Sequence, residues 1–449
     1  MNSDFLLTSQ LSRSLYHDCA KELPIIDYHN HLPLEVLTEE NAGWNITQLW
    51  IQPDPYKHRA MRILGVEERL ITGESSYYEK FRAWYTCLPR LVGNPLFDWS
   101  CMEVKQVFGY DLLPFEAPET VWEKLNRTAE ELSVKDILKK FDIEYNAPCA
   151  TLCCDLDAFQ PAEGICPSLR GDDLLLPATD YIDKLMQLTG KQIDTLEDYL
   201  SAVDLRLDAF YRAGCRFADH ALDNGFTYVP DDGDNEQRFA ALLKGELAAQ
   251  TDRNQLSGYI LTALVSQYAR VGFTVQLHIG AQRTTSARLR NLAGPAGGYA
   301  AIGNTADVSS LTALLDTVEQ KKYGLPRILL FPLNPADNAV MANLSGSYSK
   351  DGCEAVVSQG SAWWWSDHYQ GITDMLDTFA SHSVLSTFVG MTTDSRSLLS
   401  FVRHDYFRRV LCQWIADKVA CGRLPQDNDL LRDLIRRVCY ENAKNRLGE

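Results

Sequence analysis

The chain has 449 residues, of which 45% are hydrophobic and 23% are charged, the usual balance of a globular protein with a large core. Its 60 acidic and 43 basic residues give a formal net charge of −17, and no run of Lys and Arg forms a basic patch. We therefore expect neither nucleic acid nor an anionic membrane as a partner, and an anionic substrate would need a few well-placed cations.

The sequence contains neither a membrane span nor a recognisable export signal. No stretch approaches the roughly 20 apolar residues that a spanning helix needs, and the N-terminus lacks the basic start and cleavage site of a signal peptide. The 12 cysteines include no Cys-x-x-Cys pair, and Cys149, Cys153 and Cys154 lie in an apolar run where cysteine acts as a small hydrophobe. These features predict a cytoplasmic protein with free thiols.

Residues 1–33 predict a helix over 4–21, followed by a strand that ends in His29-Asn30-His31. Alternate side chains of a strand point to the same side, so both imidazoles would face one direction, about 7 Å apart along the strand. That spacing suits two ligands of one metal ion, although two histidines can also fall this close by chance.

Residues 34–145 have dense helical patterns and few strand signals. We expect helices opening at Asn45, over 54–64, and after Ser75 or Ser76, with a break at residues 93–95. The whole segment is predicted to be a helical insertion after the first strand.

Residues 146–449 alternate short apolar runs with helical stretches, a pattern typical of parallel strands joined by right-handed crossovers. With the first strand there are eight runs, the others being 147–153, 164–168, 215–220, 273–279, 327–333, 355–359 and 387–391. Helices are predicted over 195–213, 235–270, 308–322 and 369–381, and residues 400–449 are predicted to be helical. Eight units predict an α/β fold, a (β/α)8 TIM-type barrel.

Catalytic groups of such barrels lie at the C-terminal ends of the strands. The predicted strands end in, or lead to, His29, His31, Arg170, Asp219, His220, His278, Asn334, Trp363, Trp364, Trp365, Asp394 and Arg396. Closing the barrel would place the eighth strand beside the first and bring Asp394 to His29 and His31. Two imidazoles and a carboxylate are a suitable site for a divalent metal; they favour zinc, with manganese and iron as alternatives.

Several of these residues have a simpler explanation that the sequence leaves open. Asp394 could cap the helix near Ser397, and His220 could merely be oriented by Asp219. His278 could be a fourth ligand, a donor to substrate or a core residue. The three tryptophans could stack on a sugar ring or serve packing, and Arg170 and Arg396 could form surface ion pairs or bind a carboxylate in a pocket.

With these residues placed, the chain resembles the uronate isomerase (glucuronate isomerase) family of the amidohydrolase superfamily over nearly its whole length. The matching stretches are Asp27-Tyr28-His29-Asn30-His31-Leu32-Pro33, Tyr56-Lys57 with Arg59-Ala60-Met61-Arg62, Gly93-Asn94-Pro95-Leu96, Asp219-His220-Ala221-Leu222-Asp223, His278-Ile279-Gly280-Ala281, Leu333-Asn334-Pro335, Trp363-Trp364, Gly390-Met391, Thr393-Asp394-Ser395-Arg396-Ser397, and Arg403-His404 with Tyr406-Phe407-Arg408-Arg409.

The resemblance implies conversion of D-glucuronate to D-fructuronate, and of D-galacturonate to D-tagaturonate, in hexuronate catabolism. It implies that His29, His31 and Asp394 hold a zinc-type ion and that Arg170 meets the substrate carboxylate. Tyr56 and Arg396 match the family's tyrosine and arginine. We also expect His278, Trp363 and His58 to contact substrate, and a homo-oligomeric assembly.

The chain departs from the family pattern at two places. Pro55 stands where the family often has a histidine before the tyrosine, and His58 stands where a tryptophan is common. Near the C-terminus, Lys444 replaces the arginine of an Asn-Ala-Arg run. A lysine keeps the charge but loses the paired donors of arginine.

The chemistry of an aldose–ketose isomerisation fits these residues. A general base must take the C2 proton, and positive charge must stabilise a cis-enediolate. We assign the base to Asp394, with Tyr56 and Arg396 aiding proton transfer between the oxygens. Two other classes of protein remain open. One is a metal-dependent hydrolase, which would usually use further metal ligands on strands four and six, whereas strand six here offers only Asn334. The other is a sugar-binding protein without catalysis.

Overall fold

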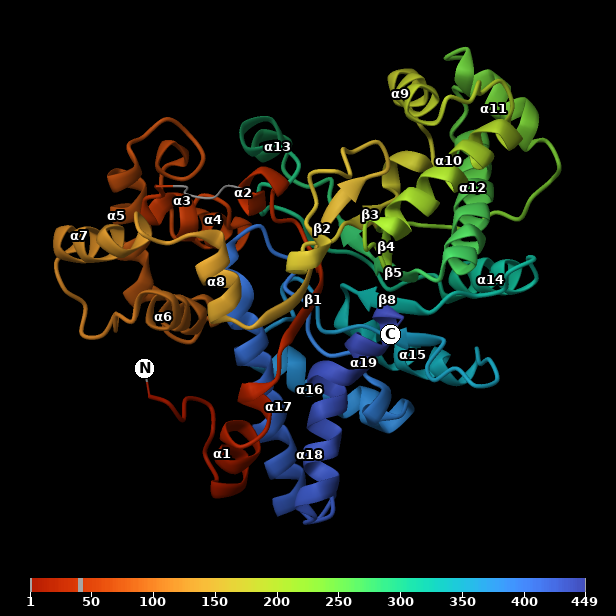
Figure 1. Cartoon of the computed structure of the whole chain (residues 1–449). Coiled ribbons are helices and arrows are strands. Elements are labelled where there is room, and N and C mark those ends of the chain that lie inside the picture. Colours follow the sequence, from red (N-terminus) through yellow and green to blue (C-terminus); the bar gives the residue numbers. More distant parts are fainter. Residues whose placement is uncertain (1, 39–42, 449) are drawn as a thin grey trace.

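The computed structural model describes residues 2–38 and 43–448. The strands in these ranges are β1 (Ile25–Asn30), β2 (Ile143–Thr151), β3 (Ser168–Arg170), β4 (Phe217–Leu222), β5 (Thr274–Ile279), β6 (Ala281–Gln282), β7 (Ala301–Ile302), β8 (Ile328–Pro332) and β9 (Val357–Gln359). Seven of them form one sheet in the order β1-β2-β3-β4-β5-β8-β9, every neighbouring pair of which is parallel. The curled sheet with its surrounding helices is a TIM-type α/β barrel (Figure 1).

The helices surround this sheet and fill the long segment between its first two strands. They are α1 (Gln10–His17), α2 (Leu34–Thr38), α3 (Ile46–Trp50), α4 (Pro55–Ile63), α5 (Tyr77–Cys87), α6 (Pro95–Phe108), α7 (Pro118–Ala129), α8 (Val134–Lys140), α9 (Thr179–Thr189), α10 (Leu196–Arg212), α11 (Asn235–Leu243), α12 (Gln250–Val271), α13 (Ala287–Ala293), α14 (Val308–Glu319), α15 (Asn338–Asn343), α16 (Tyr369–His382), α17 (Val402–Ala420), α18 (Asn428–Arg436) and α19 (Asn442–Lys444). Within residues 2–38 and 43–448, no helix is long and apolar enough to cross a membrane.

The helices of the insertion, α2 to α8, lie to one side of the sheet in Figure 1, while α10 and α12 lie on the other. Asn45 and Ser76 cap α3 and α5, where the sequence predicted helix starts. Asn94, in the predicted break, caps α6 by accepting a hydrogen bond from the Leu96 N–H. The predicted helix over 235–270 is wrong in its continuity, because α11 and α12 are separate helices with Gly245 in the left-handed region between them.

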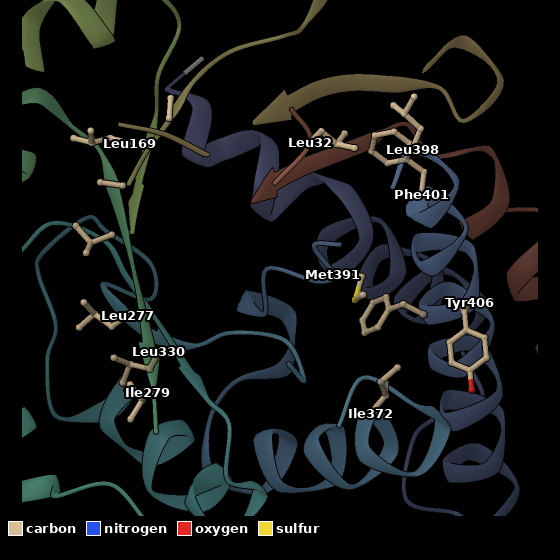
Figure 2. Packing of buried hydrophobic residues seen from close by; sticks show 14 of the residues in the cluster. Leu32, Leu169, Leu277, Ile279, Leu330, Ile372, Met391, Leu398, Phe401 and Tyr406 are labelled. Carbon is tan, nitrogen blue, oxygen red and sulfur yellow. The ribbon is translucent and has the colours of Figure 1, made fainter. Parts of the chain in front are cut away.

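Alternation along the strands divides the apolar residues into two clusters. On β8, Ile328 and Leu330 belong to the large cluster under the helices, whereas Leu329 and Phe331 belong to a smaller cluster with Phe217. Successive side chains of a strand point to opposite faces, so the smaller cluster fills the concave inside of the sheet. Figure 2 shows part of the large cluster, with Leu169, Leu277 and Leu330 on the strands and Phe401 and Tyr406 on the C-terminal helices.

The eighth predicted strand, over 387–391, is wrong. Residues 385–387 form a 3-10 turn, and the segment after it has no regular structure. Gly390 and Asp394 adopt left-handed backbone angles, with φ of 75° and 45°, which interrupt an extended chain. The carbonyl of Phe388 accepts a hydrogen bond from the Asn442 side chain, so a neighbouring strand does not pair there.

This irregular segment nevertheless lies beside β1, as barrel closure requires. The Asp394 N–H donates to the His29 carbonyl at 3.0 Å, and the His31 N–H donates to the Ser395 carbonyl at 2.8 Å. The buried Asp27 carboxylate accepts from the Thr393 N–H at 2.7 Å and from the Thr392 hydroxyl at 3.0 Å. A side chain of β1 therefore replaces part of the missing strand ladder.

The third predicted strand, over 164–168, is displaced. The ladder of β3 begins at Ser168 and ends at Arg170, since residues 161–163 form a 3-10 turn and Ile165 makes only isolated bridges. Arg170 is thus the last residue of the strand, paired in register with Asp219 of β4. The short antiparallel pair β6–β7 is not predicted from the sequence.

Candidate active site

A cavity of about 330 Å³ opens at the C-terminal ends of the strands, between the sheet and α4. Its lining contains most of the residues proposed from the sequence, namely His29, His31, Tyr56, Arg170, His278, Trp363, Asp394 and Arg396, together with Cys149, Arg283, Trp364 and Trp365. The volume is typical of a site for a small polar molecule. Residues that are up to 367 positions apart in the sequence therefore share one chamber.

Asp394 is the centre of one wall of the cavity. Its Oδ1 lies 3.3 Å from His29 Nε2 and 3.1 Å from His31 Nε2. Burial alone would raise the pKa of the Asp394 carboxyl, but the two imidazoles outweigh burial and hold that pKa well below its usual value. Asp394 is consequently a carboxylate over the working range of pH.

The other oxygen of Asp394 is held by two indoles. Trp363 donates its Nε1–H to Oδ2 at 2.6 Å, and Trp364 donates to the same oxygen. The following 3-10 turn is capped by Ser397, whose hydroxyl accepts a hydrogen bond from the Leu399 N–H. Ser397, and not Asp394, is therefore the N-cap residue here. The positive φ of Asp394 is a backbone strain that neighbouring contacts maintain, as is common at functional sites.

The site offers ligands for a divalent metal ion. Potential ligand atoms of His29, His31 and Cys149 all lie within 4.8 Å of one another, and so do those of His29, Asp219 and His278. Asp394 Oδ1 is buried without a hydrogen-bond partner of good geometry, although two imidazole nitrogens lie near it. An unsatisfied carboxylate oxygen beside two imidazoles fits a bound cation, which would supply the missing partner.

His278 lies behind this cluster, on β5. Its ring packs 4.6 Å from the ring of His29 and 4.8 Å from that of Trp363, centroid to centroid. Burial and then the neighbouring His29 lower the pKa of His278 well below its usual value, so this imidazole is neutral. Its Nδ1 lies 3.9 Å from the carboxylate of Asp219.

Asp219 and His220 point to opposite faces of β4. Asp219 lies inside the barrel, 4.0 Å from His29 Nδ1 and 3.3 Å from Arg170. His220 faces outward, where its Nε2 lies 3.0 Å from the Tyr268 hydroxyl. Its burial lowers the pKa to about 4, so His220 is a neutral core residue.

Three arginines line the cavity, and they differ in their partners. Arg170 pairs with Asp172 at 2.7 Å and with Asp219, and Arg283 pairs with Asp223 at 2.8 Å. Arg396 has no carboxylate within ion-pair distance in residues 2–38 and 43–448, and its buried guanidinium has a lowered pKa. The positive charge of Arg396 is therefore the least compensated of the three.

Tyr56 forms the opposite wall, from the first turn of α4. Asp54 caps this helix and Pro55 occupies its first position, where a proline fits without loss of a hydrogen bond. The Tyr56 hydroxyl donates to Asp367 Oδ2 at 2.9 Å, and the Arg403 guanidinium lies 4.6 Å from the ring centroid. Burial and then Asp367 raise the pKa of Tyr56 well above its usual value, so the phenol keeps its proton.

His58 lies outside this chamber. It does not line the cavity, its side chain is buried, and its Nε2 has no hydrogen-bond partner. Burial lowers its pKa to about 4. The cavity wall near it is completed by the loop at Gly298, which is packed so closely that a Cβ there would overlap the Pro55 carbonyl oxygen.

Sequence reasoning missed four residues that shape the site: Cys149, Arg283, Asp367 and Arg403. Cys149 was interpreted as a small hydrophobe, which is wrong, because its thiol lines the polar cavity at the end of β2. The position of Cys149 near the C-terminal end of a predicted strand was the signal that could have placed it in the site. Asp367 and Arg403 carry no such signal, since they reach Tyr56 from a loop and from α17.

Comparisons with known proteins identify the family of this chain. The family described as glucuronate isomerase matches residues 1–447. A curated protein named uronate isomerase, from Caldanaerobacter subterraneus, is 36% identical over 468 aligned positions, covering 100% of this chain and 99% of its own.

Solved structures add the fold. The crystal structure of a uronate isomerase from Thermotoga maritima superposes with a TM-score of 0.90 at 27% identity, covering 100% of this chain and 99% of that one. That of a glucuronate isomerase from Caulobacter crescentus superposes with a TM-score of 0.88 at 23% identity, covering 100% and 97%, and shows likeness of fold.

Proposed function

The chain belongs to the glucuronate isomerase family, and we propose on that premise how its cavity carries out the interconversion of an aldose and a ketose uronic acid. The reaction is that of D-glucuronate with D-fructuronate, and of D-galacturonate with D-tagaturonate. One observation carries the assignment: a carboxylate, a protonated phenol and the least compensated of the three guanidinium groups line one cavity, as an isomerisation through an enediolate requires.

Zinc is the proposed metal, with His29, His31 and Asp394 as ligands. Imidazole and carboxylate donors suit zinc, and a bound divalent ion would stabilise negative charge on the substrate's oxygens. The orphaned Asp394 Oδ1 supports this ligand set.

Arg170 is proposed to hold the substrate's C6 carboxylate. Its two ion pairs with Asp172 and Asp219 fix the guanidinium at the end of β3, and its planar fork can donate two parallel hydrogen bonds to a carboxylate. His278 and Trp363 are proposed to contact the sugar, because a neutral imidazole can donate a hydrogen bond and an indole presents an apolar face. His58 takes no part in this arrangement, since it does not line the cavity.

The proton transfers then follow from the residues in place. Asp394 takes the proton from C2 while the Tyr56 hydroxyl gives a proton to O1, which produces the enediol. O2 returns a proton to the Tyr56 oxygen, and Asp394 delivers its proton to C1 as the ketone forms. Arg396 stabilises the charge that develops on the two oxygens, because no carboxylate among the described residues lies within ion-pair distance of its guanidinium.

A hydrolase, the alternative for this fold, is not favoured. The end of β8 supplies Asn334, whose side chain caps the next turn and donates to the Gly303 carbonyl, and it does not line the cavity. Assembly as a homo-oligomer stays a prediction.

The direct test incubates the purified protein with D-glucuronate and D-galacturonate and follows the sugars by NMR, with metal content measured on the same sample. Appearance of the 2-keto sugar is the expected result. When the reaction is run in D2O, the product should carry one deuteron at C1 to the extent that the base exchanges its proton with solvent. Binding of either uronate without any ketose, in protein shown to be metal-loaded, would overturn the assignment.

A further inference from the structure

Cys149 lies at the end of β2, directly beside the metal-binding strand. Its neighbour Pro148 pairs in register with Asn30, which separates the two histidines of β1. The thiol is half-buried and lines the cavity. It is thus a polarizable donor at the mouth of the barrel, where the strand ends of such folds place reactive groups.

The contacts of the thiol are with the groups of the site. Its Sγ lies 3.6 Å from His29 Nδ1, and it donates to Asp219 Oδ1, also at 3.6 Å. Ligand atoms of Cys149, His29 and His31 all lie within 4.8 Å of one another. The unpartnered oxygen of Asp394, whose side chain is 7% exposed, lies 3.3 Å from His29 Nε2 and 3.1 Å from His31 Nε2. Asp394 and Cys149 therefore approach different ring nitrogens of His29.

We propose that Cys149 is a protein ligand of the bound metal, together with His29 and His31. This deepens the proposed function and rests on it only for the presence of a divalent ion. On binding, the S–H bond breaks, its electron pair becomes the sulfur–metal bond, and the proton leaves to solvent. No oxidant or reductant is required.

A thiolate ligand decides which metals the site prefers. Sulfur donors favour zinc, cobalt and cadmium, whereas a site of imidazole and carboxylate alone accepts manganese more readily. Cys149 would therefore strengthen the preference for zinc over manganese that two histidines and an aspartate already give the site.

The decisive experiment is cobalt substitution of the metal-free protein, monitored by absorption spectroscopy. A thiolate on Co²⁺ gives a charge-transfer band in the near ultraviolet, which we expect in the unaltered chain and expect to disappear in Cys149→Ser. The matched control is Cys154→Ser, because Cys154 is also a half-buried thiol near the end of β2 but does not line the cavity. Its band should equal that of the unaltered chain.

The same variants separate zinc from manganese affinity. Cys149→Ser should weaken zinc binding about tenfold or more while changing manganese binding less, and Cys154→Ser should change neither. Absence of the charge-transfer band from the unaltered, cobalt-loaded chain overturns the proposal, and so does its persistence in Cys149→Ser. The first of these outcomes needs no variant, so the proposal can fail even if Cys149→Ser does not fold.

These readouts are independent of turnover. A sulfur–cobalt band in a protein that fails to isomerise uronates would overturn the proposed function and leave the ligand intact. Isomerisation by a cobalt-loaded protein that lacks the band would overturn Cys149 as a metal ligand and leave the proposed function intact.

Discussion

The two walls of the cavity are built by different means. On the barrel wall, His29, His31 and Asp394 are fixed by main-chain hydrogen bonds between β1 and the segment after Met391. On the wall formed by α4, Tyr56 is fixed by buried charges, with Lys57 bonded to Asp54 at 2.6 Å and to Glu103 at 3.1 Å. The side chains of all three members of this charged cluster are 1% exposed.

This difference has an energetic consequence. The two main-chain hydrogen bonds between β1 and the segment after Met391 persist when one side chain of the site changes, because backbone groups carry them. A buried charge cluster is more sensitive to substitution, because loss of one charged group leaves its partners buried without their opposite charge. Changes on the barrel wall should therefore reduce activity more than stability, and changes on the α4 wall should do the opposite unless they touch Tyr56.

Asp394→Asn tests the barrel wall and should have the largest effect. The amide cannot accept the C2 proton, so kcat/KM should fall about 10³-fold or more while the protein stays folded. The measurement is ketose formation by NMR together with thermal unfolding of the same sample. Activity within tenfold of the unaltered chain would show that another group is the base.

Lys57→Met tests the α4 wall. Removing the ammonium leaves Asp54 and Glu103 buried without their cation, which should lower the free energy of unfolding by about 3–5 kcal/mol. The measurement is urea unfolding. The control is Lys105→Met, whose ion pair with Asp111 has side chains that are 42% and 43% exposed and should contribute less than about 1 kcal/mol. Equal losses in both variants would contradict the distinction between the walls.

The pH dependence of stability compares one buried histidine from each region, His58 of α4 and His220 of β4. Burial lowers the pKa of each from 6.5 to about 4. Between these values the unfolded chain binds more protons than the folded chain, so stability falls as pH drops from 6.5 to 4, by up to about 3 kcal/mol for each residue.

His58→Gln and His220→Gln should each flatten this fall, whatever their effect at neutral pH. Unfolding in urea at a series of pH values measures the slope directly. A slope unchanged in both variants would show that these imidazoles are already protonated in the folded chain.

Tyr56→Phe has the smallest expected effect, because it removes one hydroxyl and keeps the ring. Loss of the proton donor should lower kcat about 10²-fold, and Asp367 should lose one hydrogen bond, worth about 1 kcal/mol of stability. Steady-state kinetics and thermal unfolding separate the two effects. A change confined to KM would assign Tyr56 to substrate binding alone.

The barrel and most of its strand-end residues could be predicted from the sequence because their signals are local. Apolar runs of strand length, capping residues such as Asn45 and Ser76, and polar residues at strand ends all lie within a few positions of each other. The pairing of Asp394 with His29 and His31 also followed from barrel closure. The strand-end residues and the approach of Asp394 to the two histidines depend on the alternation of side chains along a strand and on the order of the strands, both of which can be predicted from the sequence.

Only the tertiary structure decided the rest. The segment after Thr387 has the apolar pattern of a strand but is irregular. Its backbone groups are hydrogen-bonded to the side chains of Asp27 and Asn442, where a strand would pair with the backbone of its neighbour. Cys149 was predicted to be a small hydrophobic residue, but its thiol lies close to His29 and His31. The inward side of β4 holds Asp219 and not His220. Composition and periodicity give the sequence of elements, whereas the partner of a buried polar group depends on residues far along the chain that folding brings beside it.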